Sequence, residues 1–342
     1  MEKVKVAVAG LGRMGAESHC VALDRLDQFD LVAGCDPTPQ TLQAVAEQFD
    51  LRGYETLEEM LNDADIDLVV VATPSAMHHD HVIKVLKAGK HCLTEKPPAM
   101  NVAQWDEMGE AACKAGKTLC CFQNARWFPH QLQAVSLVES GALGDIMAIK
   151  LISLGYSDIM RTYGVEEYRP QWRAEKRYGG GLLYDFGPHH IDRVLQMLGH
   201  APVKDVYADL STGVWSDEVE EGFVVIVRFQ NGVTAYIEQD VTIRANLNTF
   251  IVVGSDATFQ DGVVRSGQPG ELVEEEIETI DRNSDEYYLA LHRHLTEGTP
   301  PPVPWEHTRQ MMRILDAAFQ SAATRQVVSL GNWGQSPISA EE

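Results

Sequence analysis

The sequence predicts a two-domain α/β protein, with a doubly wound parallel sheet in the first domain and an antiparallel sheet in the second. Two observations predict this arrangement. Residues 1–125 alternate short apolar strands with amphipathic helices, as βαβ units do. Beyond residue 200, long strand patterns follow one another with only turn signals between them, which favours antiparallel pairing. At 342 residues the chain is long enough for two cores, and the change of rhythm divides it into domains 1–125 and 126–342.

The strands expected in the first domain are short and rich in Val, Leu and Ile, as strands buried on both faces should be. They are expected at 4–9, 31–36, 66–73, 91–94 and 118–122, with helices near 14–28, 39–49, 56–62, 77–88 and 101–115. Because βαβ crossovers are right-handed, this alternation predicts one parallel sheet with helices on both faces.

The second domain is expected to begin with a helix near 129–140 and a strand at 145–155, followed by an irregular, aromatic-rich stretch. A helix then starts near Asp185, because Pro188 is tolerated only in a first helical turn. Asn231-Gly232 is a strong hairpin signal. The later strands are expected at 203–211, 220–230, 233–243, 247–254 and 270–278, and the last helices at 284–297 and 305–324.

The strand at 220–230 is apolar on both faces. One face carries Phe223, Val225, Val227 and Phe229, and the other carries Val224 and Ile226. One face can pack on the helices of its own domain, but the other needs a second cover. We therefore expect a homodimer or homotetramer formed through this sheet.

Composition disfavours several classes of partner and location. The net charge of −22 argues against nucleic acid and anionic membranes, because phosphate-rich partners need a basic surface. The sequence has no apolar run near the roughly 18 residues of a membrane span, and no secretory pattern precedes the first strand. The six cysteines lack metal or disulfide spacing. We expect a cytoplasmic protein with reduced thiols.

A glycine-rich turn follows the first strand and opens the first helix, the context of a dinucleotide-binding fingerprint. Its residues are Gly10, Leu11, Gly12, Arg13, Met14 and Gly15. The glycines let a pyrophosphate approach the amides of the helix N-terminus. Asp36 ends the second strand, where a carboxylate binds the adenosine ribose and repels a 2′-phosphate. NAD is therefore expected, with NADP less favoured; a glycine turn needed only for packing is the competing interpretation.

Thr73 and Pro74 end the next long strand, so they are expected along the same cleft. His78, His79 and His81 resemble a metal cluster, but no cysteine or carboxylate stands at ligand spacing. No metal site is predicted, and His78 is instead placed among the cofactor contacts.

Two further segments carry candidate catalytic groups. Glu95 and Lys96 follow the strand at 91–94, where the ammonium can hydrogen-bond a substrate hydroxyl. Asp185, His189 and Asp192 stand at i, i+4 and i+7 and so share one helix face. Close to the helix N-terminus, His189 would stay neutral and available as a base. The alternatives are a surface lysine before a proline turn and a solvated amphipathic helix.

Taken together, these motifs resemble those of the Gfo/Idh/MocA oxidoreductase family, which includes glucose–fructose oxidoreductase and inositol dehydrogenase. The resemblance rests on the glycine fingerprint, on Glu95-Lys96-Pro97 and on residues 179–192, GGGLLYDFGPHHID. It extends to 123–127 and 317–321 and covers nearly the whole chain. The first of these two segments and Arg169-Pro170-x-Trp172-Arg173 are most similar to the scyllo-inositol and sugar dehydrogenase branch.

The resemblance implies an NAD(P)-binding Rossmann domain and a substrate-binding and oligomerisation domain with a large, open antiparallel sheet. It also implies a catalytic trio, mapping onto Lys96, Asp185 and His189, and a cis peptide before Pro97 that aims the lysine into the cleft. Ala125 is a departure, because members usually have a second arginine there; the role of that side chain is left open in this chain.

We therefore predict an NAD(P)-dependent dehydrogenase that transfers a hydride between the nicotinamide and a secondary alcohol of a sugar, sugar derivative or inositol. His189 removes the hydroxyl proton, Asp185 orients His189, and Lys96 donates to the same oxygen. Lys96 could equally be the principal acid–base group, and Asp192 could bind substrate hydroxyls or anchor a loop. The alternatives are an NAD-dependent glycosidase, a non-catalytic NAD-binding sensor, and reduction of an imine or enone. The expected substrate contacts are Lys96, Arg126, Trp172, Arg173, Asp185, His189 and Asp192, under a cover that includes Tyr163 and Tyr178.

Overall fold

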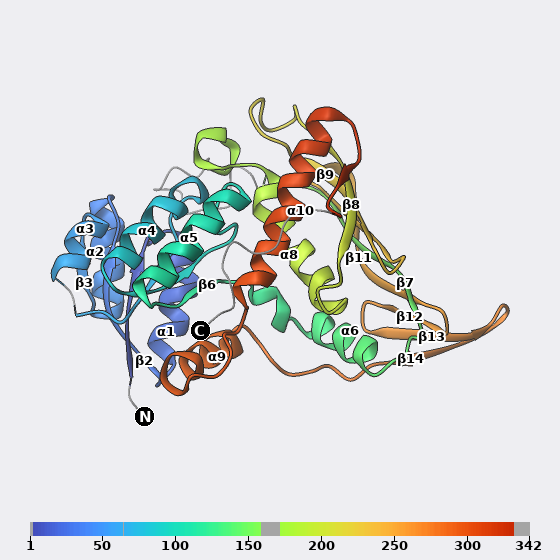
Figure 1. The fold of residues 1–342 in the computed structure, drawn as a ribbon, viewed down its shortest axis with the longest axis horizontal. Coiled ribbons are helices and arrows are strands. Elements are labelled where there is room, and N and C mark those ends of the chain that lie inside the picture. Colours follow the sequence, from blue (N-terminus) through green and yellow to red (C-terminus); the bar gives the residue numbers. More distant parts are fainter. Residues whose placement is uncertain (1–2, 64, 159–171, 332–342) are drawn as a thin grey trace.

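The computed structural model describes residues 3–63, 65–158 and 172–331. Figure 1 shows two sheets separated by helices, among them α8 (Leu182–Met197) and α10 (Trp305–Thr324). Tyr163, Arg169 and Pro170, which the sequence associates with the substrate region, lie outside the described residues.

The first domain contains a six-stranded sheet in the order β3-β2-β1-β4-β5-β6, with every neighbouring pair parallel. The five predicted strands are confirmed; the sixth, β3, was missed because it is short and two of its three residues are exposed. The strands are β1 (Val4–Ala9), β2 (Phe29–Cys35), β3 (Arg52–Tyr54), β4 (Leu68–Val71), β5 (His91–Thr94) and β6 (Leu119–Cys121).

The helices of this domain lie close to their predicted positions, with one difference after the glycine-rich turn. The helix expected at 14–28 is a π-helical segment followed by a short α1 (Val21–Arg25). The π-helical segment is Met14–Cys20. The others are α2 (Pro39–Phe49), α3 (Leu57–Asp63), α4 (His78–Lys87) and α5 (Val102–Ala115).

The second domain contains a nine-stranded sheet in the order β14-β13-β12-β11-β7-β10-β9-β8-β15. The prediction that it is antiparallel was wrong for one pair, because β7 and β10 run parallel. A helix, α8, separates β7 from the β8–β10 meander, so this pairing comes from a crossover and not from a hairpin. The strands are β7 (Ile146–Tyr156), β8 (Val203–Ser211), β9 (Gly222–Phe229), β10 (Thr234–Asp240), β11 (Thr242–Gly254), β12 (Ala257–Gln260), β13 (Val263–Gln268), β14 (Glu271–Glu276) and β15 (Val328–Ser329).

One face of this sheet is covered by helices. Phe223, Val225, Val227 and Phe229 of β9 are buried in one core with residues of α8 and α10, as their alternation predicted. Val224 and Ile226 on the other face are only partly buried. The hairpin at Asn231-Gly232 joins β9 to β10 in antiparallel register, as predicted.

A late helix, α9 (Asp285–Glu297), returns to the first domain. Tyr287, Tyr288 and Leu291 are buried in the same cluster as Val4 and Val6 of β1. Figure 1 shows α9 beside α1 and β2. The unit built on the first sheet therefore includes a helix that follows most of the second domain in sequence.

The prediction that the central helix starts near Asp185 was wrong, because α8 begins at Leu182 and Pro188 lies inside it. A distant residue supplies the cap: the Glu220 carbonyl accepts from the Leu182 N–H at 3.0 Å, and its carboxylate accepts from the Leu183 N–H at 3.0 Å. Capping by a segment far away in sequence leaves no local start signal. The helix continues beyond Pro188, although proline has no N–H to donate to the carbonyl four positions earlier.

Within the described residues, α6 (Pro129–Glu139) and the remaining helices are each too short or too polar to cross a membrane.

Candidate active site

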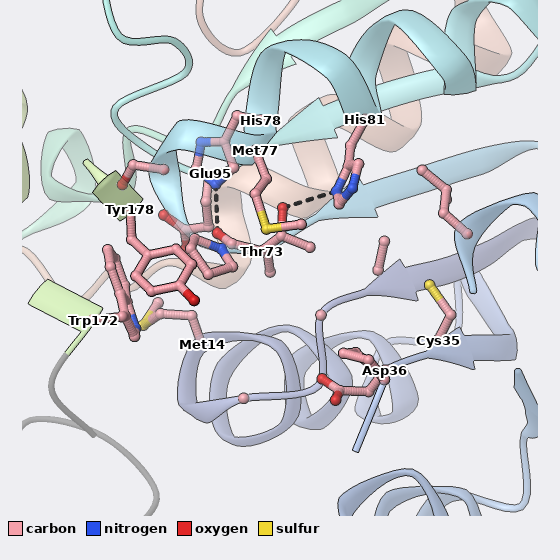
Figure 2. A pocket seen from close by; sticks show the side chains of 18 of the residues that line it. Met14, Cys35, Asp36, Thr73, Met77, His78, His81, Glu95, Trp172 and Tyr178 are labelled. Carbon is pink, nitrogen blue, oxygen red and sulfur yellow. Dashed lines mark hydrogen bonds between the residues drawn. The ribbon is translucent and has the colours of Figure 1, made fainter. Parts of the chain in front are cut away.

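A cavity of about 770 Å³ lies along the carboxyl edge of the first sheet. Figure 2 shows Asp36 towards one end of it, with Glu95, Trp172 and Tyr178 towards the other. Ligands of open α/β sheets bind at this edge where the strand order reverses, here between β1 and β4. The second domain contributes Trp172, Arg173, Tyr178 and Asp185 to the lining, so both domains form this cavity.

The glycine-rich turn forms one wall, and its glycines are needed for different reasons. Gly10 has φ +89°, and a Cβ there would lie 2.7 Å from the Ala72 carbonyl oxygen. A Cβ on Gly15 would lie 1.8 Å from the Gly10 carbonyl oxygen. A Cβ on Gly12 would meet nothing within 4 Å, so its backbone faces open space in which a pyrophosphate fits. Arg13 and Met14 also line the cavity.

Asp36 is buried at the end of β2, and its two carboxylate oxygens hold the surrounding loops. One oxygen accepts from the Leu11 N–H and the other from the Thr38 N–H, each at 2.9 Å. A carboxylate oxygen can accept more than one hydrogen bond, and a carboxylate at the end of this strand is suited to ribose hydroxyls. The flanking cavity residues Cys35, Pro37 and Thr38 carry no positive charge that would bind a 2′-phosphate.

Lys96 and Asp185 meet across the domain boundary. The Lys96 Nζ donates to Asp185 Oδ1 at 2.6 Å and also to the Asp185 backbone carbonyl. The Arg173 Nε donates to Asp185 Oδ2 at 3.0 Å. Burial would raise the pKa of Asp185, but the charges of Lys96 and Arg173 outweigh it and hold that pKa well below its usual range. Asp185 is therefore an ionised link between two cations.

The prediction that Asp185 orients His189 through a hydrogen bond does not match this geometry. The described residues provide no hydrogen-bond partner for the His189 Nδ1, and both Asp185 oxygens face cations. His189 is neutral as expected, since burial first and Lys96 second lower its pKa to about 3. The helix dipole is not the main reason, because His189 is two turns inside α8 and the dipole acts within the first turn.

Glu95 joins a buried chain of side chains that the sequence did not reveal. Its Oε1 lies 3.0 Å from His19 Nε2, and His19 Nδ1 lies 2.8 Å from the Tyr288 hydroxyl. Its Oε2 accepts from the Lys96 N–H at 2.9 Å. Burial opposes ionisation, but the hydrogen bond to His19 and the charge of Lys96 lower the pKa of Glu95 to about 2. No local pattern signals the chain, because 269 positions separate His19 from Tyr288.

His78 lines the cavity, but its ring is turned to the protein backbone. Nδ1 lies 2.7 Å from the Pro97 carbonyl oxygen, and Nε2 lies 2.7 Å from the Thr73 carbonyl oxygen. Figure 2 also shows His81 bonded to the Thr73 hydroxyl, at 3.1 Å. His79 instead pairs with Glu107 on α5. The three histidines thus take separate partners, and the described part of the chain holds no cluster suited to a metal ion.

Arg126 and Asp192 form a second buried ion pair. The guanidinium makes two hydrogen bonds to the carboxylate, at 2.7 and 2.6 Å, and Asp192 is fully buried. Neither residue belongs to the cavity lining, although the sequence placed both among the substrate contacts. Ala125, the departure from the family pattern, is buried next to this pair in sequence.

The segment before α8 approaches the first domain closely. The Arg173 guanidinium lies 4.4 Å from the Trp172 ring centroid. Gly179 has φ +73°, and a Cβ there would lie 2.6 Å from the Met100 sulfur. The Lys96–Pro97 peptide is cis, as the resemblance implied.

Comparison with known proteins supports the expected family. Residues 4–123 match the "Oxidoreductase family, NAD-binding Rossmann fold" domain, and residues 132–260 match the "GFO/IDH/MocA C-terminal domain". The chain is 26% identical to scyllo-inositol 2-dehydrogenase (NADP(+)) of Bacillus subtilis and 27% identical to D-glucoside 3-dehydrogenase of Escherichia coli, covering 96% of this chain and 97% of each relative. The aldose-aldose oxidoreductase of Caulobacter crescentus, solved with glycerol, superimposes with a TM-score of 0.81 at 26% identity, covering 96% of this chain and 100% of that one. The chain therefore belongs to the Gfo/Idh/MocA oxidoreductase family, and its first domain is an NAD-binding Rossmann domain.

Proposed function

We propose that this protein is an NAD-dependent dehydrogenase that oxidises, reversibly, a secondary alcohol of a sugar, sugar derivative or inositol. The observation that carries this proposal is the contact between Lys96 and Asp185, because it brings a charged donor from one domain and a carboxylate acceptor from the other into the cavity of the dinucleotide fingerprint. The named activities of the relatives support the substrate class.

The residues of the cavity fit NAD. The open space at Gly12 accepts a pyrophosphate, and the buried carboxylate of Asp36 accepts ribose hydroxyls. When bound, NAD accepts the hydride from the substrate carbon. Arg13, Met14, Thr73, Pro74, His78 and Glu95 complete the predicted set of cofactor contacts and all line the same cavity.

Lys96 is placed to donate to the substrate oxygen. Its ammonium has three N–H donors, of which two are bound by the Asp185 carbonyl and carboxylate. The third remains for the reacting hydroxyl, where it would stabilise negative charge as the proton leaves. Asp185 and Arg173 then act on Lys96 and not on His189: the ionised carboxylate holds the ammonium in place.

His189 is the second candidate acid–base group. Its neutral ring offers a lone pair that can accept the hydroxyl proton, although His189 is not among the residues that line the cavity. Trp172 and Tyr178 line the cavity towards the end where Glu95 lies, and aromatic faces suit the C–H faces of a sugar ring.

The outer face of the second sheet supports a proposal about the oligomeric state. Val224 and Ile226 leave an apolar strip on the face that the helices do not cover, with Tyr207 and Tyr236 more than one-third exposed on neighbouring strands. We infer that a second copy of the chain covers this face, in a homodimer or homotetramer. We also propose that the protein acts in the cytoplasm.

A substrate panel tests the proposed activity. Inositols, aldoses, sugar acids and glycosides are incubated with NAD and with NADP in parallel, and the absorbance of the reduced cofactor is followed. Reduced NAD released in proportion to substrate supports a dehydrogenase. Cleavage of a glycoside without net reduction would instead identify a redox-assisted glycosidase. Binding of NADH without turnover of any compound would favour a sensor.

A further inference from the structure

We propose that two buried histidines, His19 and His78, clamp the Lys96-Pro97 dipeptide from both sides and so position the Lys96 ammonium. This inference rests on the proposed role of Lys96 in the reaction. Neither histidine reaches the reacting atoms, and both act through the backbone that carries Lys96; they are positioning residues.

The first half of the clamp holds the backbone N–H of Lys96. That N–H donates to Glu95 Oε2 at 2.9 Å, and the other Glu95 oxygen lies 3.0 Å from His19 Nε2. A carboxylate only accepts, so the His19 Nε2 donates to Glu95, and Nδ1 lies 2.8 Å from the Tyr288 hydroxyl. His19 thus links Glu95 to Tyr288.

Burial makes this first half rigid. His19 is fully buried, Tyr288 is 1% exposed and Glu95 is 5% exposed. Loss of any member would leave a polar group without a partner in the interior, which is costly. His19 lies in the π-helical segment after the glycine-rich turn, and Tyr288 comes from α9, so three distant segments fix one backbone group.

The second half holds the carbonyl of Pro97. His78 Nδ1 lies 2.7 Å from that oxygen, and Nε2 lies 2.7 Å from the Thr73 carbonyl at the end of the neighbouring strand. His78 is 1% exposed and sits in the first turn of α4. Both carbonyl oxygens only accept, and a neutral imidazole has one N–H, so we assign that proton to Nδ1, which donates to the Pro97 carbonyl. This bond links α4 to the loop after β5, at the sheet edge where the cavity lies.

The two halves bind the two outer backbone groups of the dipeptide, the N–H of Lys96 and the carbonyl of Pro97. A lysine side chain has four rotatable bonds, so its ammonium is well placed only if its backbone is fixed. A displacement of about 1 Å at a reacting group can cost on the order of 10²-fold in rate. Loosening the clamp should therefore lower kcat more than it weakens cofactor binding.

The test compares His78→Gln, His19→Gln and Tyr288→Phe with His91→Gln. His91 is a matched control because it also bonds the backbone: its Nδ1 accepts from the Thr118 N–H at 3.0 Å. It lies at the start of β5, the end of the strand away from Lys96 and the cavity. Tyr288→Phe removes a single hydroxyl, so it tests the first half even where the His19 variant does not fold.

Three quantities are measured for each folded variant: kcat and KM, the NADH dissociation constant by fluorescence, and the rate at which acetic anhydride labels Lys96 in the cofactor-free protein. We expect the variants on both sides of the dipeptide to lower kcat by about 10- to 100-fold and to label Lys96 severalfold faster. His19→Gln and Tyr288→Phe, whose residues do not line the cavity, should also keep the NADH constant within about twofold. The His91 control should leave all three at wild-type values.

Unchanged labelling of Lys96 in His78→Gln and Tyr288→Phe would overturn the clamp. An effect from one side alone would also overturn it, as would loss of NADH affinity in parallel with kcat in the His19 and Tyr288 variants. A wild-type protein that turns over no substrate would refute the proposed function only. Labelling and NADH binding need no turnover, so they would still decide whether the clamp exists.

Discussion

Asp185→Asn removes one negative charge from between two cations while keeping the size of the side chain. In the native protein the carboxylate is about 10% exposed and bonds Lys96 at 2.6 Å and Arg173 at 3.0 Å. Asparagine retains one acceptor for the ammonium, but its amide N–H group would face the Arg173 donor. Breaking one partner out of a buried ion pair costs about 3–5 kcal/mol, so we expect a loss near the lower end, about 3 kcal/mol at neutral pH.

The pH dependence of this loss gives it a signature. The pKa of Asp185 is lowered in the folded state, so its stabilisation is present above the unfolded pKa of about 4 and is lost as the pH falls further. The difference in free energy of unfolding between wild type and variant should thus be largest near neutral pH and shrink in acid. Urea unfolding followed by tryptophan fluorescence, at neutral pH and in acid, measures this difference.

Asp192→Asn is the matched control, because Asp192 is a buried carboxylate on the same helix that pairs with Arg126 outside the cavity lining. It should lose comparable stability but less than about tenfold in kcat, whereas Asp185→Asn should lose on the order of 10²-fold through the displaced Lys96. A selective rise in KM for Asp192→Asn would instead support the alternative that Asp192 binds substrate. Asp185→Asn with wild-type stability and turnover would refute the assigned link.

Three further changes and one measurement follow from the same geometry. His189→Ala should lower kcat by about 10²–10⁴-fold, the scale of one acid–base group. Stopped-flow or steady-state kinetics with the best substrate would measure this loss. Asp36→Ala should weaken NAD binding and narrow the preference over NADP, which titration with both cofactors checks; an unchanged ratio would contradict the ribose contact. Burial raises the pKa of Glu220 to about 7, so ionisation of this cap costs the folded state stability as the pH rises between about 4.5 and 7. In Glu220→Gln, the free energy of unfolding measured in urea should no longer fall over this pH range, a fall of up to roughly 3 kcal/mol in the wild type. Light scattering at micromolar concentration should give a dimer or tetramer, and a monomer would remove the argument from the outer face of β9.

Much of the fold could be predicted from periodicity because its signals are local. The strands β1, β5 and β8 and the helices α2 and α10 occupy the residues that apolar patterning and turn signals assign to them. The strands β3, β12, β13 and β15 were missed. They are only two to six residues long, and every position of β3, β13 and β15 is part-buried or exposed. Apolar alternation is weak in such strands, so pairing with longer neighbours decides their existence.

Many of the predicted site residues line the cavity, but Arg126, His189 and Asp192 do not, and the connections among the site residues were not predicted. The spacing of Asp185 and His189 correctly puts both on one side of α8, yet spacing carries no information about what approaches from another domain. Lys96 lies in the loop after β5, and Arg173 lies in the segment before α8. Each donates a hydrogen bond to one of the two Asp185 carboxylate oxygens. The local partner is left out because a cation offers a buried carboxylate a stronger bond than a neutral imidazole does.

The same reasoning explains why the lysine is the better-defined member of the trio. Lys96 has a fixed backbone on both sides, two occupied donors and one remaining N–H, whereas His189 has a buried Nδ1 without a partner among the described residues. An unpartnered ring nitrogen in a polar site is costly unless a bound group satisfies it. Lys96, by contrast, is held in place before any substrate is bound. Lys96→Ala should therefore abolish turnover. It should also bring the pKa of His189, followed by NMR of the ring protons, closer to 6.5, because the ammonium is one of three causes that lower it, with burial and His190.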